Sequence, residues 1–178
     1  GSAWNLLAGY TGQVSFGHAI FFGTGAYTAG LCVTKLGISA WWGMLLGGPV
    51  ALLVGLIIGW ICFRLRGPYF ALATIAIGEI FRLVATDWRE LTDGMEGILI
   101  MQSFHSKLPY YYLALALAVA CVFAVHLVLK SKWGYYFVTI REDQDVAEAI
   151  GISSFRYKSL SLMISSFFTG MAGAFYMN

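Results

Sequence analysis

Long runs of apolar residues, each with few or no charges, recur along the chain and predict its architecture. A helix needs about 20 apolar residues to cross a bilayer, because the hydrocarbon core is about 30 Å thick and a helix rises about 1.5 Å per residue. Five runs meet or approach this length, at 14–34, 40–63, 68–86, 109–129 and 160–177. The pattern therefore predicts an all-α, polytopic bundle of about five membrane helices.

The second and third runs differ in how clearly they indicate a membrane helix. The second opens at Trp41 and closes at Trp60, which places aromatic anchors at both interfaces. The third contains Glu79 and Arg82, which share a helix face at a spacing of three and can pair. Glu79 lies near mid-span, and two roles stay open for it. It could bind a proton or a solute in a transport path, or its ion pair could hold neighbouring helices together.

The Lys and Arg residues of the short connections predict how the helices are oriented, because basic residues favour the cytoplasmic side. Connection 64–67 holds Arg64 and Arg66, and connection 130–159 holds five basic residues, so both are expected inside. Connection 87–108 has more carboxylates than basic residues, which suits the outer side. Its apolar stretch 98–101 is expected to rest on the interface or on a docked partner.

The first run is rich in glycine and polar residues, in the stretch GYTGQVSFGHAIFFGTGAYTAG. Such a stretch is typical either of closely packed helices or of a broken helix that lines a solute path, and both interpretations stay open. Gln13, Ser15 and His18 are the path candidates. Ser15 with His126 of the fourth run also allows the hypothesis of an intramembrane hydrolase, against the simpler expectation of hydrogen bonds between helices.

Composition narrows the function classes. Only 11% of the 178 residues are charged, against about 25% in soluble domains. The net charge of +2 comes from scattered basic residues and gives no support for nucleic-acid binding. The three cysteines lie apart in apolar runs, which disfavours a zinc site or a disulfide framework. No phosphate-binding G-x-x-x-x-G-K-[ST] loop occurs, so we expect any ATP to be used by a partner. Taken together, these features predict that the chain binds no cofactor or metal and has no enzymatic site.

The most informative connection is 130–158, expected to be a cytoplasmic loop of a single membrane domain that covers 1–178. Within WGYYFVTIREDQDVAEAIGISSFRYK, Asp145 and Glu148 fit a capping box, 146–150 suits a short helix, and Gly151 can end it. Such a helix suits a groove on a soluble partner, and packing against its own bundle is the alternative. Its apolar residues are Val146, Ala147, Ala149 and Ile150.

Four stretches in order carry a family resemblance. They are GYTGQVSFGHAIFFGTGAYTAG, RLRGPYFALATIAIGEIFRLV, IREDQDVAEAIGI, and Tyr157-Lys158 followed by Gly170, Ala172 and Gly173. With them the chain resembles the membrane-spanning permease subunits of bacterial branched-chain amino-acid ABC importers, of the LivH/LivM type and closer to LivM. Chains of that family are longer at both ends, so this sequence is expected to be part of a longer one.

The resemblance implies ATP-driven import of Leu, Ile or Val across the bacterial inner (plasma) membrane. The implied partners are a second permease subunit, two cytosolic ATPases that use ATP and Mg, and a periplasmic or extracellular solute-binding protein. Urea or another small amide or acid as the solute, and a proton-coupled secondary carrier, are the alternatives. The short helix then resembles the coupling helix of ABC permeases, and the residues expected to couple to the ATPase are Arg141, Glu142, Asp143, Asp145, Ala147, Glu148, Ala149 and Gly151.

Overall fold

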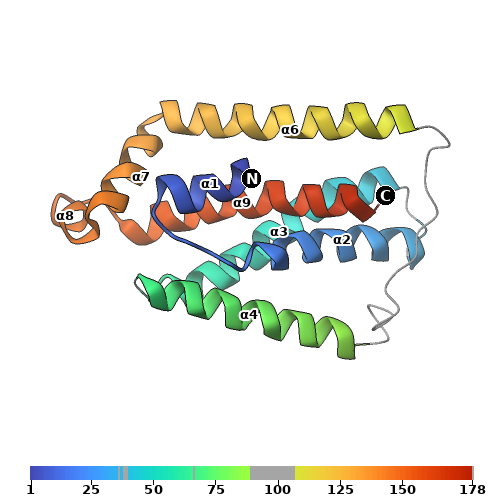
Figure 1. The fold of residues 1–178 in the computed structure, drawn as a ribbon, viewed down its shortest axis with the longest axis horizontal. Helices are drawn as coiled ribbons and strands as arrows, with labels where there is room; N and C mark the ends of the chain where they lie inside the picture. Colours follow the sequence, from blue (N-terminus) through green and yellow to red (C-terminus); the bar gives the residue numbers. More distant parts are fainter. Residues whose placement is uncertain (36, 38–39, 66, 89–106, 178) are drawn as a thin grey trace.

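The computed structural model describes residues 1–178 except 36, 38–39, 66, 89–106 and 178, and the described part is built of helices joined by short connections (Figure 1). The long helices α3, α4, α6 and α9 are each long and apolar enough to cross a membrane. The elements in chain order are α1 (Ser2–Asn5), the π-helix η1 (Leu6–Tyr10), α2 (His18–Thr34), α3 (Ala40–Cys62), α4 (Pro68–Asp87), α6 (Lys107–Lys130), α7 (Lys132–Glu142), α8 (Gln144–Ala149) and α9 (Ser154–Met177).

Helices α2, α3 and α9 form the tightly packed centre of the bundle. A Cβ atom added to Gly25 of α2 would collide with the backbone of Gly170 of α9, and one added to Gly173 would collide with the Phe22 carbonyl. On Gly47 of α3, an added Cβ would lie 2.6 Å from the Ala174 side chain. Small residues therefore let these three backbones approach closely, which is how membrane helices gain dispersion contacts. The expectation of close helix packing in the first run is confirmed.

Helices α4 and α6 lie at the periphery, on opposite sides of this centre (Figure 1). Only 11% of the α4 span and 6% of the α6 span are buried inside the bundle. Pro68 begins α4, where its missing N–H has no helical partner to lose. Most side chains of both helices thus face outward, where a bilayer or further protein would surround them.

The ends of the helices follow the predicted alternation. The α3–α4 turn, α7 and α8 lie at one end of the bundle, whereas the end of α4 and the start of α6 lie at the other (Figure 1). The first end holds both connections expected inside, and we call it the α8 end. The outer connection falls largely on 89–106, so the prediction for its apolar stretch 98–101 lies outside the described residues.

The starts of α2 and α9 differ from those predicted, and α7 is an additional helix. The first run is helical only from His18, because residues 11–17 form an irregular segment, so the expected full-length span at 14–34 is wrong. Helix α9 begins at Ser154 rather than Leu160, since polar and aromatic residues extend the helix beyond the apolar run. Helix α7 was not predicted at all, because its residues lack a long apolar run; Ser131 caps its start by accepting from Trp133 N at 3.2 Å.

Candidate functional site

Residues 11–17, which we call the reversal, interrupt the chain between η1 and α2. Helices α1 and η1 run toward the α8 end, and α2 begins part-way along the bundle and runs back toward the other end (Figure 1). Gly12 sits in the reversal with a φ of +71°, a backbone conformation that glycine adopts without steric cost. The broken helix that the sequence left open as an alternative is therefore present.

The backbone groups freed by the reversal find partners within the protein, as they must at membrane depth. Gln13 N donates to Leu7 O at 3.0 Å, which closes a wide turn. Thr11 Oγ1 lies 3.1 Å from Leu6 O and 3.0 Å from Ser161 Oγ of α9. Thr11 and Ser161 are both fully buried, so this hydrogen-bonded pair fixes η1 against α9.

A second set of hydrogen bonds joins α1, α2 and α9. His18 Nε2 and Ser165 Oγ are 2.7 Å apart, and Ser165 Oγ donates to Ala3 O at 2.6 Å. The serine hydroxyl has a single proton, so His18 Nε2 is the donor in that pair. His18 Nδ1 is buried and has no hydrogen-bond partner among the described residues.

The reversal is also tied to α4. Phe16 N donates to Thr74 Oγ1 at 3.2 Å, and Ser15 Oγ accepts from Gly17 N at 3.2 Å. Trp4 Nε1 donates to Ser15 O at 2.8 Å. The reversal thus touches α1, α4 and α9, and movement of this segment would be felt by all three.

The structure brings three of the four path candidates together. Gln13 and Ser15 lie in the reversal, and His18 begins α2 directly after it. Glu79 instead lies on an exposed face of α4, where Arg82 Nε donates to its two carboxylate oxygens at 3.1 and 3.0 Å. The predicted pairing of Glu79 with Arg82 is confirmed, and a role for Glu79 in a solute path stays a prediction.

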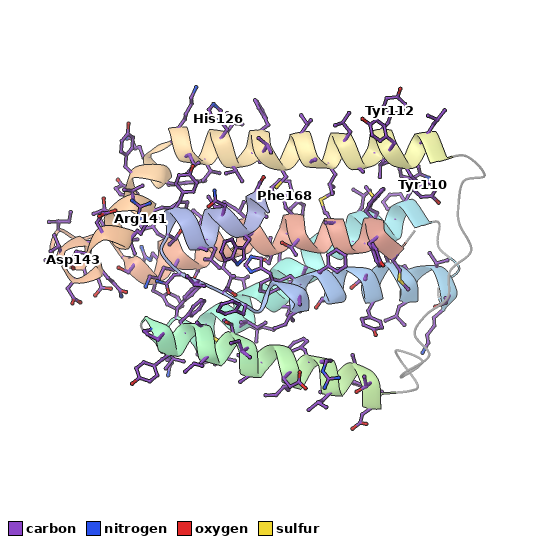
Figure 2. All side chains as sticks on the ribbon, in the orientation of Figure 1. Tyr110, Tyr112, His126, Arg141, Asp143 and Phe168 are labelled. Carbon is purple, nitrogen blue, oxygen red and sulfur yellow. The ribbon has the colours of Figure 1, made fainter. Side chains whose placement is uncertain are left out.

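The hydrolase hypothesis finds no geometric support. His126 is exposed and points away from the bundle on the outer side of α6 (Figure 2), whereas Ser15 is buried. The described partner of the Ser15 hydroxyl is the Gly17 amide, and the serine that pairs with a histidine is Ser165. Hydrogen bonding between helices, the simpler expectation, accounts for the His18–Ser165 pair.

At the α8 end, the short helix is present and firmly capped. The side chain of Asp143 accepts from Asp145 N at 2.9 Å and from Val146 N at 3.1 Å. The cap is therefore Asp143, and the predicted capping box that starts at Asp145 is wrong, because the helix begins at Gln144. At the other end Gly151, with a φ of +87°, donates to Glu148 O, and Ile152 N donates to Ala147 O. These two bonds form a Schellman motif.

Helix α8 divides into an inner and an outer face. Ala147 is fully buried and lies on the inner face, and its expected part in coupling to the ATPase stays a prediction. Ala149 is exposed, and Val146 and Ile150 are 55% and 66% exposed. Buried Lys158 of α9 donates from Nζ to Gln144 Oε1 at 2.6 Å, which anchors the first residue of α8 to the bundle. The outer face is thus a small apolar surface on a rigid support.

Arg141 and Asp143 end α7 and lead into α8 (Figure 2). Arg141 Nη1 donates to Gly9 O of η1 at 3.1 Å, and Arg141 Nε donates to Glu142 Oε1 at 3.0 Å. Arg141 was expected to couple to the ATPase, which stays a prediction, and its guanidinium contacts η1 just before the reversal.

A family model described as branched-chain amino acid transport system / permease component matches residues 1–178. The chain belongs to this family. It is 27% identical to the high-affinity branched-chain amino acid transport system permease protein LivM of Salmonella typhimurium (strain LT2), and 28% identical to the protein of the same name from Escherichia coli (strain K12).

Both alignments cover 99% of this chain and 48% of the relative, so the chain spans about half the length of these curated relatives. No solved structure matches the chain. Membership in the permease family confirms the family resemblance noted in the sequence. The helical fold with several membrane-capable helices is the one expected of such a permease.

Sequence reasoning missed the α9 side of the polar site. Ser161 and Ser165 are four apart, so they share one face of α9, and both are fully buried. Their spacing of four within the last predicted membrane run was the available signal. Lys158 entered the prediction as a basic residue of the connection and as part of a family motif, and nothing in the sequence shows that its amine contacts Gln144.

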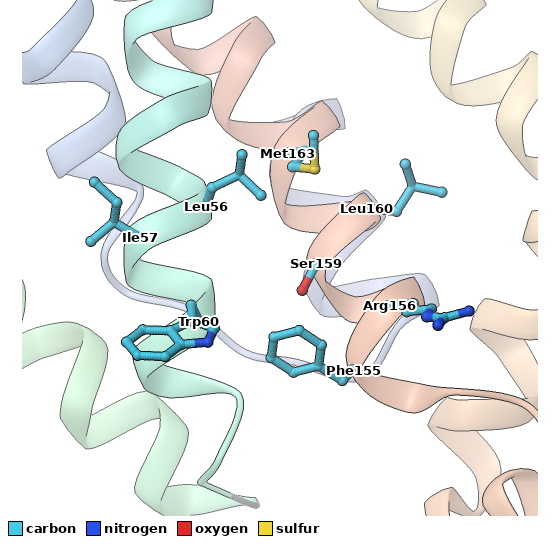
Figure 3. Close-up of a pocket in the computed structure, with 8 residues that line it drawn as sticks. All are labelled: Leu56, Ile57, Trp60, Phe155, Arg156, Ser159, Leu160 and Met163. Atoms are coloured by element: carbon cyan, nitrogen blue, oxygen red, sulfur yellow. The ribbon is translucent and has the colours of Figure 1, made fainter.

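An open groove lies between α3 and α9 near the α8 end, with a volume of about 710 Å³ (Figure 3). Its lining is almost wholly apolar, and the Arg156 side chain extends away from Ile57 and Trp60 (Figure 3). An amino acid needs polar partners for its ammonium and carboxylate groups. Ser159 and Arg156 are the polar residues of its lining, so the groove offers few partners for the charged groups of an amino acid. Its lining residues are Leu56, Ile57, Trp60, Phe155, Arg156, Ser159, Leu160 and Met163.

Proposed function

We propose that this chain is part of the membrane-spanning permease of an ATP-driven importer for Leu, Ile or Val in the bacterial inner membrane. Membership in the permease family and the names of the two LivM relatives support this proposal. The observation that carries its mechanism is α8, a capped helix that presents an exposed apolar face at the end of the bundle predicted to be cytoplasmic.

Helix α8 has the properties of a docking element. Its exposed Val146, Ala149 and Ile150 offer apolar area, while Asp145 and Glu148 flank that area with charge. An amphipathic helix of this kind binds a groove on its partner, and its rigid caps reduce the entropy lost on docking. The proposed partners that offer such a groove are two cytosolic ABC ATPases, which bind ATP and Mg. A second permease subunit and an external solute-binding protein complete the proposed assembly.

The proposed solute path passes the reversal. The N-terminal end of α2 carries the positive end of the helix dipole, which favours a carboxylate. Gln13 and Ser15 precede this end, and His18 begins it. With Nε2 as the donor to Ser165, the buried His18 Nδ1 is an acceptor with no described partner, which suits the ammonium group of a solute. The apolar side chain of Leu, Ile or Val would lie against the aromatic and aliphatic residues of α2 and α9. Glu79 stays a candidate for the same path.

Substitution of Ala149 by Arg tests the docking role. Because Ala149 is exposed, the bulky cation leaves the bundle folded but blocks the apolar face. We expect recovery of the ATPases in affinity purification and uptake of labelled leucine in membrane vesicles to fall at least about tenfold, which corresponds to about 1.4 kcal/mol or more. Ala149→Ser, which adds little volume, is the matched control and keeps both.

Two outcomes would contradict the proposal. Full ATPase recovery and uptake in Ala149→Arg would remove α8 as the docking element. Uptake that needs no ATP, follows the proton gradient and stops in Glu79→Gln would instead indicate a secondary carrier.

A competition assay tests the solute class. Unlabelled leucine, isoleucine and valine should each reduce the uptake of labelled leucine, whereas unlabelled urea should not.

A further inference from the structure

Helices α7 and α8 are joined so that they move together. Asp143 is the residue after α7 and the N-cap of α8, and its N–H donates to Thr139 O of α7 at 3.1 Å while its side chain caps α8. A single residue with both roles leaves no flexible linker between the two helices. A displacement of α8 is therefore passed to the last turn of α7, where Arg141 lies.

Arg141 connects that last turn to the segment before the reversal. Its Nη1 donates to Gly9 O, and the C-terminal carbonyls of a helix favour a cationic donor. The stem of the same side chain packs on Gly12: a Cβ added there would lie 2.8 Å from Arg141 Cγ and 3.4 Å from Arg141 Cα. Arg141 thus contacts the backbone just before the reversal, at Gly9, and within it, at Gly12.

From Gly9 the contacts continue into the centre of the bundle. Helices α1 and η1 carry the Ala3 and Leu6 carbonyls, which accept hydrogen bonds from Ser165 and Ser161 of α9 at 2.6 and 3.3 Å. Ser165 also pairs with His18, the first residue of α2. Every link between Asp143 and the start of α2 is a backbone connection, a hydrogen bond or a packed contact. Such spatial continuity identifies a route for movement, which coupling measurements must test.

We propose that Arg141 is a strut inside the permease, which converts displacement of α8 into movement of η1 and the reversal. This inference rests on the proposed function and adds a residue that acts within the chain, as a positioning residue, without needing to touch the ATPase. Docking belongs to the outer face of α8, and transmission belongs to Arg141. The two roles predict different consequences for substitution.

The test uses the complete transporter in proteoliposomes, with ATPase recovery, ATP hydrolysis and leucine uptake measured on the same preparation. Arg141→Met keeps the length of the stem and removes every donor. We expect ATPase recovery and hydrolysis within about twofold of the wild type, while leucine transported per ATP falls at least about tenfold. Arg141→Lys keeps one donor and should give an intermediate ratio. Lys132→Met, which removes an exposed cation from the other end of α7, is the matched control and should keep the wild-type ratio.

Hydrogen exchange gives a second readout, which is measured first on the wild-type complex and then on Arg141→Met. Nucleotide binding by the ATPases should change amide exchange at residues 11–17, and the change should be lost in Arg141→Met. A wild-type ratio in Arg141→Met, loss of ATPase recovery in that variant, or exchange at 11–17 that does not respond to nucleotide would each overturn the strut. ATPase binding that survives Ala149→Arg would instead overturn the proposed function, so the two failures are distinguishable.

Discussion

Helices α9 and α6 are both 24 residues long, yet the less apolar of the two is the one that the bundle buries. In α9, 39% of the membrane-capable span lies inside the bundle, and in α6, whose span is the more apolar, 6%. A water-soluble protein would show the opposite order, because water expels apolar surface. In a bilayer the lipid tails are as apolar as leucine, so apolar surface alone does not draw helices together.

Small side chains and hydroxyl groups explain why α9 is more deeply buried than α6. Gly170, Gly173 and Ala174 let α9 approach the backbones of α2 and α3, and Ser161 and Ser165 hydrogen-bond to α1 and η1. The middle of α6 consists mainly of alanine and larger aliphatic and aromatic residues. Close packing and hydrogen bonds therefore bury α9, whereas α6 keeps an outward surface suited to lipid or to a further subunit.

The largest expected effect comes from adding one methyl group at the tightest approach. In Gly173→Ala the new Cβ meets the Phe22 carbonyl, a backbone group that cannot rotate away. We expect a loss of about 3 kcal/mol or more in the free energy of unfolding, from overpacking. Gly23→Ala on α2 is the control, because nothing lies within 4 Å of its added Cβ. It should gain up to about 1 kcal/mol from helix propensity. Chemical unfolding in detergent measures both, and equal stability of the two variants would contradict close packing as the cause.

A smaller effect is expected when the same side chain is truncated in each of the two compared helices. Leu162 of α9 is 2% exposed and Leu115 of α6 is 47% exposed. Leu162→Ala opens a cavity against α3 and should cost about 2 to 3 kcal/mol. Leu115→Ala removes surface that the bundle does not cover and should change stability by less than about 0.5 kcal/mol. A large loss in Leu115→Ala would show that another protein segment, and not lipid, covers α6.

The smallest effect isolates the hydroxyl contribution of α9. Ser165→Ala removes hydrogen bonds to His18 and Ala3 and should cost about 1 kcal/mol, the usual size for such bonds between membrane helices. Ser159→Ala, whose hydroxyl has no hydrogen bond among the described residues, is the control on the same helix and should be neutral. The difference is measured as a shift of Tm in detergent. No difference between the variants would mean that the Ser165 bonds are replaced by water or by new partners.

Apolar periodicity and basic residues were enough to predict the outline of this protein. The runs 40–63, 68–86 and 109–129 lie within one or two residues of α3, α4 and α6. Length and apolar character fix such helices locally, since each must satisfy its own backbone hydrogen bonds in hydrocarbon. The Lys and Arg counts likewise placed the α3–α4 turn and α8 at one end of the bundle. Gly151 correctly predicted the end of α8, because the residue that follows a helix often needs a positive φ, which glycine adopts easily.

Only the tertiary structure decided which helices are central and which groups meet. No local pattern shows that Ser165 pairs with His18, that Arg141 reaches Gly9, or that Ala147 is buried while Ala149 is exposed. The reversal is a further case, because its glycines allowed either a continuous or a broken helix. Hydrogen bonds with residues of α4 and α9 stabilise the broken form. Contacts between residues about 60 to 160 positions apart depend on the three-dimensional path of the chain, and a linear pattern of residue types carries no record of it.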